Sequence, residues 1–317
     1  MFKGSEVFST PFTVSVGNLA FGGRGKTPVA IYIARRLLEA GERPAVLSRG
    51  YGRRYVEDGA VIVSDGEGLC ADLDRSGDEP MLIALAVPGA AVLVCEQRAI
   101  AAALAHHVLQ STALVLDDGF QHRSVARDLD IVIISMSDLQ DRRAPFGRLR
   151  ESTRALARAS AVVIDGALPE GFAQTIPDVL RGKALFALRR SLGSALPLES
   201  NRPWLSLTGP ALALAGIAQP ERFTASLAAA GWSIVGLRAY PDHHRYTFED
   251  LDRVAAAARE AGVNAVVTTE KDAVRLLPLR PFPVPIAAVP LDVALEPIGA
   301  APAFGDWLIH AVARSRS

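Results

Sequence analysis

The segment from Val14 to Thr27 carries the residue types that bind nucleotide phosphates. It reads Val14-Ser-Val-Gly-Asn-Leu-Ala-Phe-Gly-Gly-Arg-Gly-Lys-Thr27, between an apolar run and a helical pattern. Glycines let backbone N–H groups turn toward phosphate oxygens, a lysine reaches the β- and γ-phosphates, and a threonine hydroxyl binds Mg²⁺. The expected phosphate-binding residues are Gly22, Gly23, Gly25, Lys26 and Thr27. The strict P-loop pattern has Gly where this chain has Ala20, and the alternative is a glycine-rich turn without a ligand.

Two acids at the end of a second apolar run are candidates for holding Mg²⁺. The run Ala113-Leu-Val-Leu-Asp-Asp118 is typical of a buried strand that ends in two carboxylates. A P-loop enzyme needs a carboxylate at the end of a neighbouring strand to hold the metal ion, so we expect Asp117 and Asp118 near Mg²⁺. The alternative is that the two acids only cap a turn.

Three further clusters combine acids, histidines or arginines. Arg75-Ser-Gly-Asp-Glu-Pro80 places two acids before a helix, where capping by Asp78 or Ser76 is the simple alternative. Pro241-Asp-His-His-Arg-Tyr246 holds a histidine pair, and zinc is not expected because no third ligand stands nearby. Arg142-Arg-Ala-Pro-Phe-Gly-Arg-Leu-Arg-Glu151 either recognises phosphate through its guanidinium groups or forms a solvated basic loop.

Alternating strands and helices must position these residues. Short runs rich in Val, Ile and Leu, each compatible with a strand buried on both faces, are Phe12–Val16, Pro44–Leu47, Ala60–Val63, Ala91–Val94, Ala113–Leu116, Asp130–Ile134 and Ala161–Ile164. The helical patterns between them are Thr27–Ala40, Asp78–Ala86 and Arg98–His107. The alternation predicts an α/β fold over residues 1–190, with a mostly parallel sheet and helices on both faces.

A smaller α/β domain is expected after a connection rich in Pro, Gly and Ser. The connection covers residues 191–209, and the smaller domain covers residues 210–300. Its expected strands are Ala211–Ala218, Ser233–Leu237 and Ala265–Thr269, and its expected helices are Pro220–Ala230 and Thr247–Ala261. Thr247 followed by Asp250 resembles a capping box. Residues 301–317 should form a C-terminal helix.

The composition argues against several classes of protein. The chain has 317 residues, half of them hydrophobic, with 34 basic and 34 acidic residues. A formal charge of zero argues against a nucleic-acid binder that relies on bulk positive charge. Cys70 and Cys95 show no metal-ligand spacing and argue against a disulfide framework, which indicates a reducing compartment. The N-terminus lacks the apolar region of a signal peptide, and Ala211–Ala218 is too short to span a bilayer.

Taken in order along the chain, these motifs resemble the tetraacyldisaccharide 4′-kinase family of lipid A biosynthesis. The matching segments of the first half are Ser15–Thr27, Ser48-Arg-Gly-Tyr-Gly52, Ser76-Gly-Asp-Glu-Pro80, Asp117-Asp-Gly-Phe-Gln-His122 and Leu149-Arg-Glu151. Those of the second half are Ala215-Gly-Ile-Ala218 with Pro220 and Phe223, Asp242-His-His244 and Thr269-Glu-Lys-Asp272. Each motif alone is a weak signal, but their order over nearly the whole chain is specific.

The resemblance implies an activity and an architecture. The family transfers the γ-phosphoryl group of ATP to the 4′-hydroxyl of a tetraacylated glucosamine disaccharide 1-phosphate, which is a lipid A precursor, and forms lipid IVA. Its fold is a P-loop domain and a smaller α/β domain, joined by a β-stranded linker, with the site in the cleft. By motif, Lys26 and Thr27 would serve ATP and Mg²⁺, and Asp78 with His243, in preference to His244, would form the catalytic pair. The residues implied near the metal are Thr27, Asp117, Asp118 and Glu79, and those implied near the substrate are Arg98, Arg150 and Glu151.

The resemblance also implies a place of action, because the acceptor is a lipid. We expect a cytoplasmic protein that lies peripherally on the inner-membrane surface, and no protein partner is implied. Members of the family usually carry an apolar, basic segment before the P-loop strand, whereas about a dozen residues precede it here. Either another surface reaches the lipid, with the arginines of residues 142–150 as its basic component, or the chain is shortened.

The sequence is also compatible with two functions other than a kinase. A P-loop NTPase of the switch or chaperone type has a similar glycine-rich loop, and phosphate transfer to an acceptor rather than to water would separate it from a kinase. A non-catalytic nucleotide-binding module is the second alternative. Such a module has no need of Asp78 and His243 facing the phosphate loop.

Overall fold

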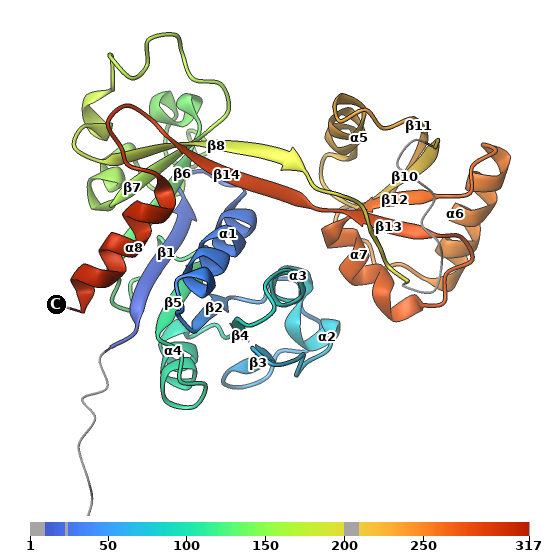
Figure 1. Ribbon diagram of the computed structural model, residues 1–317, viewed down its shortest axis with the longest axis horizontal. Coiled ribbons are helices and arrows are strands. Elements are labelled where there is room, and N and C mark those ends of the chain that lie inside the picture. The colour runs from blue at the N-terminus through green and yellow to red at the C-terminus, as the bar shows by residue number, and fades with distance from the viewer. Residues whose placement is uncertain (1–9, 23–24, 200–208, 317) are drawn as a thin grey trace, which may run out of the picture.

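The chain folds around two β-sheets, and this confirms the α/β class predicted from the sequence. The computed structural model describes residues 10–22, 25–199 and 209–316. Figure 1 shows a larger and a smaller lobe, with two long strands running between them. Within the described residues, one sheet has nine strands and the other has five.

The larger sheet is mostly parallel. Its strands are β1 (Phe12–Asn18), β2 (Pro44–Ser48), β3 (Val61–Asp65), β4 (Ala91–Val94), β5 (Ala113–Asp117), β6 (Leu129–Ile134), β7 (Ala161–Asp165), β8 (Ala184–Leu192) and β14 (Leu291–Pro297). Their order is β14-β8-β7-β6-β1-β5-β2-β4-β3, and only the pairs β3–β4 and β8–β14 are antiparallel. The phosphate-loop strand β1 therefore lies between β5 and β6, so the carboxyl end of β5 adjoins the loop.

Helices cover both faces of this sheet, as the continuous apolar runs predict. The helices are α1 (Lys26–Glu39), α2 (Leu73–Ser76), α3 (Asp78–Ala86), α4 (Arg98–His107) and α8 (Phe304–Ser315), with the 3₁₀ helices η1 (Met136–Gln140), η2 (Thr153–Arg158) and η3 (Asp178–Leu180). On one face, β1 side chains such as Val14 pack with α1, α3 and α8. On the other face, α4 packs against β2, β4 and β5, while η2 packs against β6 and β7. Burial on both faces explains why strands such as β2, β4, β5 and β7 are nearly continuous apolar runs.

The smaller sheet forms the core of the second lobe. Its strands are β9 (Leu196–Pro197), β10 (Ala211–Ala215), β11 (Ile234–Ala239), β12 (Val266–Thr269) and β13 (Ile286–Val289), in the order β11-β10-β12-β13-β9. The helices are α5 (Pro220–Ala229), α6 (Phe248–Glu260), α7 (Glu270–Leu276) and the 3₁₀ helix η4 (Leu277–Leu279). The capping box predicted at the start of α6 is present between Thr247 and Asp250. Strand β10 ends at Ala215, earlier than expected, because Gly216 leaves the sheet and bonds Asp272.

The two lobes are connected by the antiparallel pair β8 and β14. Strand β8 leads out of the larger lobe and β14 leads back into it (Figure 1). Strand β14 falls inside the range 210–300 expected for the smaller domain, yet it pairs along its whole length with β8 in the larger sheet. Helix α8 then packs on the larger lobe, where the ring of Phe304 lies 5.0 Å from that of Phe186. The second lobe is thus an insertion between two adjacent strands of the first.

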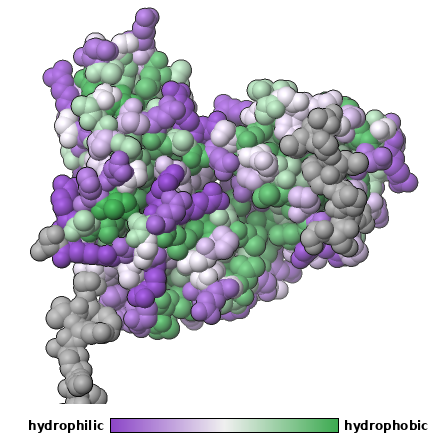
Figure 2. Space-filling view, viewed as in Figure 1, coloured by the Kyte–Doolittle hydropathy of each residue, from purple (hydrophilic) through white to green (hydrophobic). Residues whose placement is uncertain are grey.

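The face seen in Figure 2 mixes hydrophilic and hydrophobic residues on both lobes. Long exposed side chains contribute much of the hydrophilic colour, as expected for a chain in which charged residues are a fifth of the total. Among the helices of residues 10–22, 25–199 and 209–316, none has the length and apolar composition needed to cross a membrane.

Candidate active site

The phosphate loop follows β1 and ends where α1 begins. Gly25 precedes Lys26 directly and has φ +79°, a left-handed conformation that glycine adopts without strain. Gly22 has φ +104°. Gly23, which the sequence also assigns to the loop, lies outside the described residues. Ala20, the departure from the strict pattern, is buried and forms a β-bridge with Leu149.

Asp117 stands at the carboxyl end of β5, next to the start of α1. Its Oδ2 atom lies 3.4 Å from the hydroxyl of Thr27, and its side chain is buried. Its Oδ1 atom is also buried and has no hydrogen-bond partner among the described residues. Burial, together with the nearby carboxylates of Glu79 and Asp118, raises the pKa of Asp117 to about 7. A buried carboxylate oxygen without a donor is suited to a metal ion, since it has already lost its water.

Asp118, at the same edge of the sheet, forms ion pairs with two cations. The Lys26 ammonium lies 3.0 Å from its Oδ1 atom, and the Arg150 guanidinium lies 3.0 Å from its Oδ2 atom. Burial alone would raise the pKa of Asp118, but the charges and hydrogen bonds of Lys26 and Arg150 outweigh it and lower that pKa. Asp118 is therefore ionised at neutral pH and holds both cations beside the phosphate loop.

Arg98 contacts the backbone of Asp117, and Glu151 follows Arg150 in the chain. The guanidinium of Arg98 is buried and donates to the carbonyl oxygens of Cys95, at 2.5 Å, and Asp117, at 3.5 Å. Burial lowers the pKa of Arg98, and its Nε atom has no hydrogen-bond partner within the described part of the chain. Glu151 is paired with Arg158 at 3.1 Å rather than with the residues around Asp118. The structure thus brings Arg98 and Arg150 to the strand-end acids and holds Glu151 in a separate pair.

Asp78 and His243 come together from the two lobes. Asp78 is the first residue of α3, after Gly77 at φ +84°, and the Nδ1 atom of His243 lies 3.0 Å from its Oδ2 atom. His244, the alternative partner, is instead paired with Asp250 at 3.0 Å. With Asp78 ionised, the Nδ1–H group of His243 is the donor. The second lobe therefore supplies an imidazole to a carboxylate of the first.

Two cations of α7 also reach α3, and the sequence did not single them out as site residues. Lys271 lies 2.9 Å from Glu79, and the Nε atom of Arg275 lies 3.5 Å from Oδ2 of Asp78. Lys271 belongs to the motif Thr269-Glu-Lys-Asp272, and Arg275 stands one helical turn later. That spacing is the only signal in the sequence that places both cations on one face of a helix.

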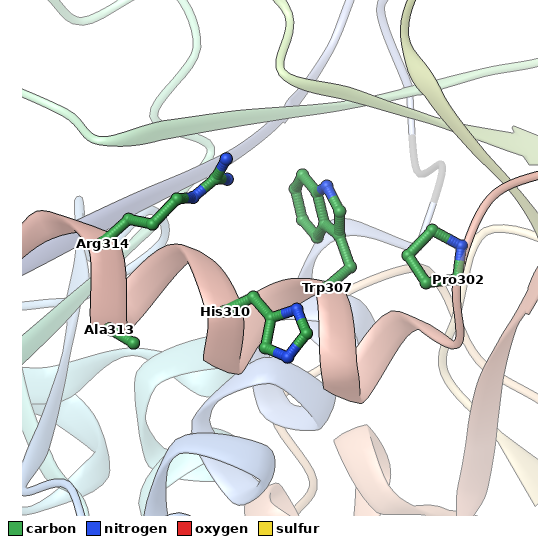
Figure 3. A pocket seen from close by; sticks show the side chains of 5 residues that line it. All are labelled: Pro302, Trp307, His310, Ala313 and Arg314. Carbon is green, nitrogen blue, oxygen red and sulfur yellow. The ribbon is translucent and has the colours of Figure 1, made fainter.

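A separate depression lies along α8, away from the phosphate loop. Its volume is about 500 Å³, and its lining residues are Pro302, Trp307, His310, Ala313 and Arg314. Figure 3 shows these side chains on α8 and the turn before it. None of these residues belongs to the phosphate loop, to the strand-end acids or to the cross-lobe pairs, so the depression has no part in the chemistry described here.

The described residues hold no group of three His, Cys, Asp or Glu side chains arranged to bind a metal by themselves. Mg²⁺ is usually held by one or two protein oxygens together with phosphates and water. Thr27 and Asp117 offer oxygens of this kind at the loop.

Comparisons with known proteins agree with this geometry. Residues 3–312 match the family described as tetraacyldisaccharide-1-P 4′-kinase. A tetraacyldisaccharide 4′-kinase of Anaeromyxobacter sp. (strain Fw109-5) is 42% identical over 299 residues, which are 89% of this chain and 78% of the relative. The corresponding protein of Desulfotalea psychrophila is 37% identical, with 83% and 78% covered.

A solved structure supports the same assignment. The crystal structure of "apo" form LpxK from Aquifex aeolicus, in complex with ATP, superposes with a TM-score of 0.76. It is 29% identical and covers 96% of this chain and 88% of that one. The match extends over both lobes, so the likeness is not that of an isolated P-loop domain. The chain belongs to the tetraacyldisaccharide-1-P 4′-kinase family.

Proposed function

We propose that this chain transfers the γ-phosphoryl group of ATP to the 4′-hydroxyl of a tetraacylated glucosamine disaccharide 1-phosphate. Two sets of residues carry the proposal, and Glu79, which follows Asp78, links them because its carboxylate helps to raise the pKa of Asp117. Lys26 and Thr27 adjoin strand-end acids that suit a metal–nucleotide complex, and Asp78, paired with His243, suits the activation of an alcohol. Membership of the family supports the identity of the acceptor.

The nucleotide half of the site fits ATP with Mg²⁺. Thr27 and Asp117 would hold the ion, because the hydroxyl and the unpartnered Oδ1 atom are oxygens at the phosphate loop. Asp118 and Glu79 would complete the acidic surroundings. When bound, Mg²⁺ would neutralise charge on the phosphates. Lys26 and the backbone of the loop, with Gly22 and Gly25, would bind the β- and γ-phosphates.

Asp78 is the base in this proposal. It accepts the proton of the 4′-hydroxyl as the oxygen attacks the γ-phosphorus, and ADP departs with the electrons of the broken P–O bond. His243 orients the carboxylate through the 3.0 Å contact and shares the proton. Arg98 and Arg150 would stabilise negative charge on the transferring phosphoryl group or the substrate, and Glu151, next to Arg150 in the chain, would hold Arg158 through its ion pair.

The acceptor requires contact with a lipid surface, which we place on the cytoplasmic face of the inner membrane. The loop after η1 is suited to this contact. Phe146 is 84% exposed there, and Arg142 and Arg143, which precede it in the loop, are exposed as well. The loop adjoins the phosphate loop, since the backbone N–H of Phe21 donates to the backbone carbonyl of Arg148 at 2.8 Å. An exposed apolar side chain with two cations nearby in the same loop would attach peripherally to anionic lipid.

One experiment tests the proposed activity. The purified chain is incubated with ATP, Mg²⁺ and a tetraacyldisaccharide 1-phosphate, and the lipid is examined by mass spectrometry. We expect one added phosphate, located on the 4′-oxygen by fragmentation. A matched incubation without acceptor measures hydrolysis of ATP by water. Hydrolysis that is independent of the acceptor, with no phosphorylated lipid, would instead favour a P-loop switch-type NTPase.

A further inference from the structure

We propose that Arg275 is a positioning residue. It holds the loop of His243, in the smaller lobe, in the position that lets the imidazole contact Asp78 of the larger lobe. The inference rests on the proposed function, since it concerns how that site is assembled. Arg275 is buried and lies on α7, the helix that faces α3. Its guanidinium is the one cation that contacts both the loop of His243 and the carboxylate of Asp78 within the described residues.

The guanidinium of Arg275 contacts the turn at Gly216, the loop that holds His243 and His244, and Asp78 at the start of α3. One terminal nitrogen donates to the carbonyl of Gly216 at 3.0 Å and to Asp272 at 2.9 Å, while the other donates to the carbonyl of His244 at 3.2 Å. The Nε atom donates to the backbone carbonyl of Lys271 at 3.2 Å and lies 3.5 Å from Oδ2 of Asp78. A planar guanidinium presents five N–H groups in a fixed fork, so it can hold these acceptors at once, whereas a lysine ammonium cannot match that geometry.

The backbone of His243 depends on the same acceptor. Its N–H group donates to the carbonyl of Gly216 at 3.2 Å, the oxygen that Arg275 also contacts. His243 has φ +59°, a left-handed conformation that costs free energy in a residue with a side chain. Such a conformation persists only when its surroundings determine it. Arg275 supplies that restraint, because it donates to the carbonyl that accepts from the His243 N–H and to the carbonyl of the next residue, His244.

Asp272 and Tyr246 hold Arg275 in turn. Asp272 is fully buried, and its Oδ1 atom accepts from the backbone N–H of Gly216 at 3.0 Å and from the Tyr246 hydroxyl at 2.7 Å. Burial and the neighbouring Asp272 carboxylate raise the pKa of Tyr246, so its hydroxyl stays protonated and remains a donor. The side chains therefore form a satisfied buried network rather than an isolated ion pair.

The hydrogen-bond network around Arg275 reaches the carboxylate of Asp78, the base in the proposed reaction. His243 at 3.0 Å and Arg275 at 3.5 Å both approach the Oδ2 atom of Asp78. We therefore assign the other oxygen, Oδ1, to the proton of the acceptor hydroxyl. The neighbouring charged groups are the Lys271–Glu79 pair, whose members also come from α7 and α3. Arg275 acts through this placement and not by contact with the substrate.

A second cross-lobe arginine provides a matched control. Arg245 lies 2.8 Å from Asp74, so it also joins the smaller lobe to the larger one. Its side chain is 57% exposed, and its partner belongs to α2 rather than to the α3 terminus. An arginine that only held the lobes together would behave like Arg245.

The test is a double-mutant cycle on the full chain, with detergent-solubilised tetraacyldisaccharide 1-phosphate as the acceptor. The variants are Arg275→Lys, His243→Ala, the double variant, and Arg245→Met. We expect Arg275→Lys to lower kcat by about 10- to 100-fold through misplacement, with KM for ATP nearly unchanged. In the His243→Ala background, Arg275→Lys should lower kcat by less than about threefold, because the group that Arg275 positions is gone. Arg245→Met should lower kcat by less than about fivefold.

The outcomes separate the inference from the proposed function. Losses that multiply in the double variant, or an equal loss in Arg245→Met, would overturn the positioning role while leaving the kinase activity intact. A wild-type chain that phosphorylates no lipid would remove the proposed function and this inference with it. If Arg275→Lys does not fold, Tyr246→Phe replaces it, since it deletes only the hydroxyl bond to Asp272. That variant should lower kcat by about three- to tenfold, again only when His243 is present.

Discussion

The ammonium nitrogen of Lys26 lies 3.0 Å from the Oδ1 atom of Asp118. Arg150 contacts the other oxygen of the same carboxylate, so one acid at the end of β5 holds two cations beside the phosphate loop. The pKa of Asp118 is lowered by these cations in spite of its burial, which keeps the acid charged at neutral pH. A phosphate that enters the loop therefore meets cations already fixed in place, which reduces the reorganisation needed during transfer.

Replacing Lys26 by alanine should abolish phosphoryl transfer. The β- and γ-phosphates lose their fixed positive partner, and we expect kcat to fall by at least about 10²-fold, as for the loss of other preorganised groups. Arg36→Ala is the matched control, because Arg36 lies on the same helix and pairs with Glu39 on the surface. Initial rates of lipid phosphorylation measure both variants. Turnover by Lys26→Ala near that of Arg36→Ala would remove the P-loop assignment.

Thr27 should govern the use of Mg²⁺. Thr27→Ala removes the hydroxyl that lies 3.4 Å from Asp117, and we expect the Mg²⁺ concentration for half-maximal rate to rise about tenfold. Thr27→Ser keeps the hydroxyl and should stay close to wild type. Titrating Mg²⁺ at saturating ATP compares the three proteins. An equal shift in the serine and alanine variants would mean that packing, rather than the hydroxyl, is responsible.

Asp117 should make the metal-free protein less stable as the pH rises. Its pKa is raised to about 7 in the folded state, above its ordinary value of 3.8, so the folded state holds a proton that the unfolded state has released. The free energy of unfolding that Asp117 contributes therefore falls as the pH rises from 3.8 to about 7, and it does not change further at higher pH.

The variant Asp117→Asn isolates this contribution. Between about pH 5 and about pH 8, the wild type should lose on the order of 3 kcal/mol more in the free energy of unfolding than the variant does. Urea unfolding in the presence of a chelator at the two pH values measures the difference. Parallel pH dependence in the two proteins would show that Asp117 does not titrate in this range.

The loop of residues 142–148 should control attachment to lipid. We expect Arg142→Gln, Arg143→Gln and Phe146→Ser together to weaken partition to anionic vesicles by at least about tenfold, since about 1 kcal/mol is lost per cation near the surface. Partition of the wild type should weaken with salt. Phe248→Ser with Arg253→Gln is the control, because both residues are exposed on α6 of the smaller lobe. Sedimentation with vesicles gives the partition, and equal behaviour of the two variants would exclude the loop.

Much of the larger lobe was predictable from local patterns. Buried parallel strands are continuous apolar runs, and the seven runs predicted for this lobe correspond to β1–β7. The linking strand β14 was not foreseen as part of the larger sheet. Only Leu295 is buried in it, and its partner β8 lies about a hundred residues earlier, so neither periodicity nor neighbouring sequence marks the pairing.

The site shows the same division between local and long-range information. The glycines, Lys26 and Thr27 could be proposed as phosphate-binding residues because one short segment holds them all. The alternative that Asp78 is only a helix cap could not be tested by sequence pattern, since its partner His243 is 165 residues away. Arg275 was missed for the same physical reason, because its acceptors belong to loops that only the folded chain brings together.

Asp78 is proposed to accept the proton of the attacking hydroxyl, and the kcat of Asp78→Asn across a range of Mg²⁺ concentrations measures this role. General-base help is worth roughly 10²- to 10⁴-fold, so kcat should fall by about that factor while ATP binding is retained. The loss should be the same at every Mg²⁺ concentration. Recovery of kcat at high Mg²⁺ would contradict the account, because it would make Asp78 a metal-site residue instead of the base.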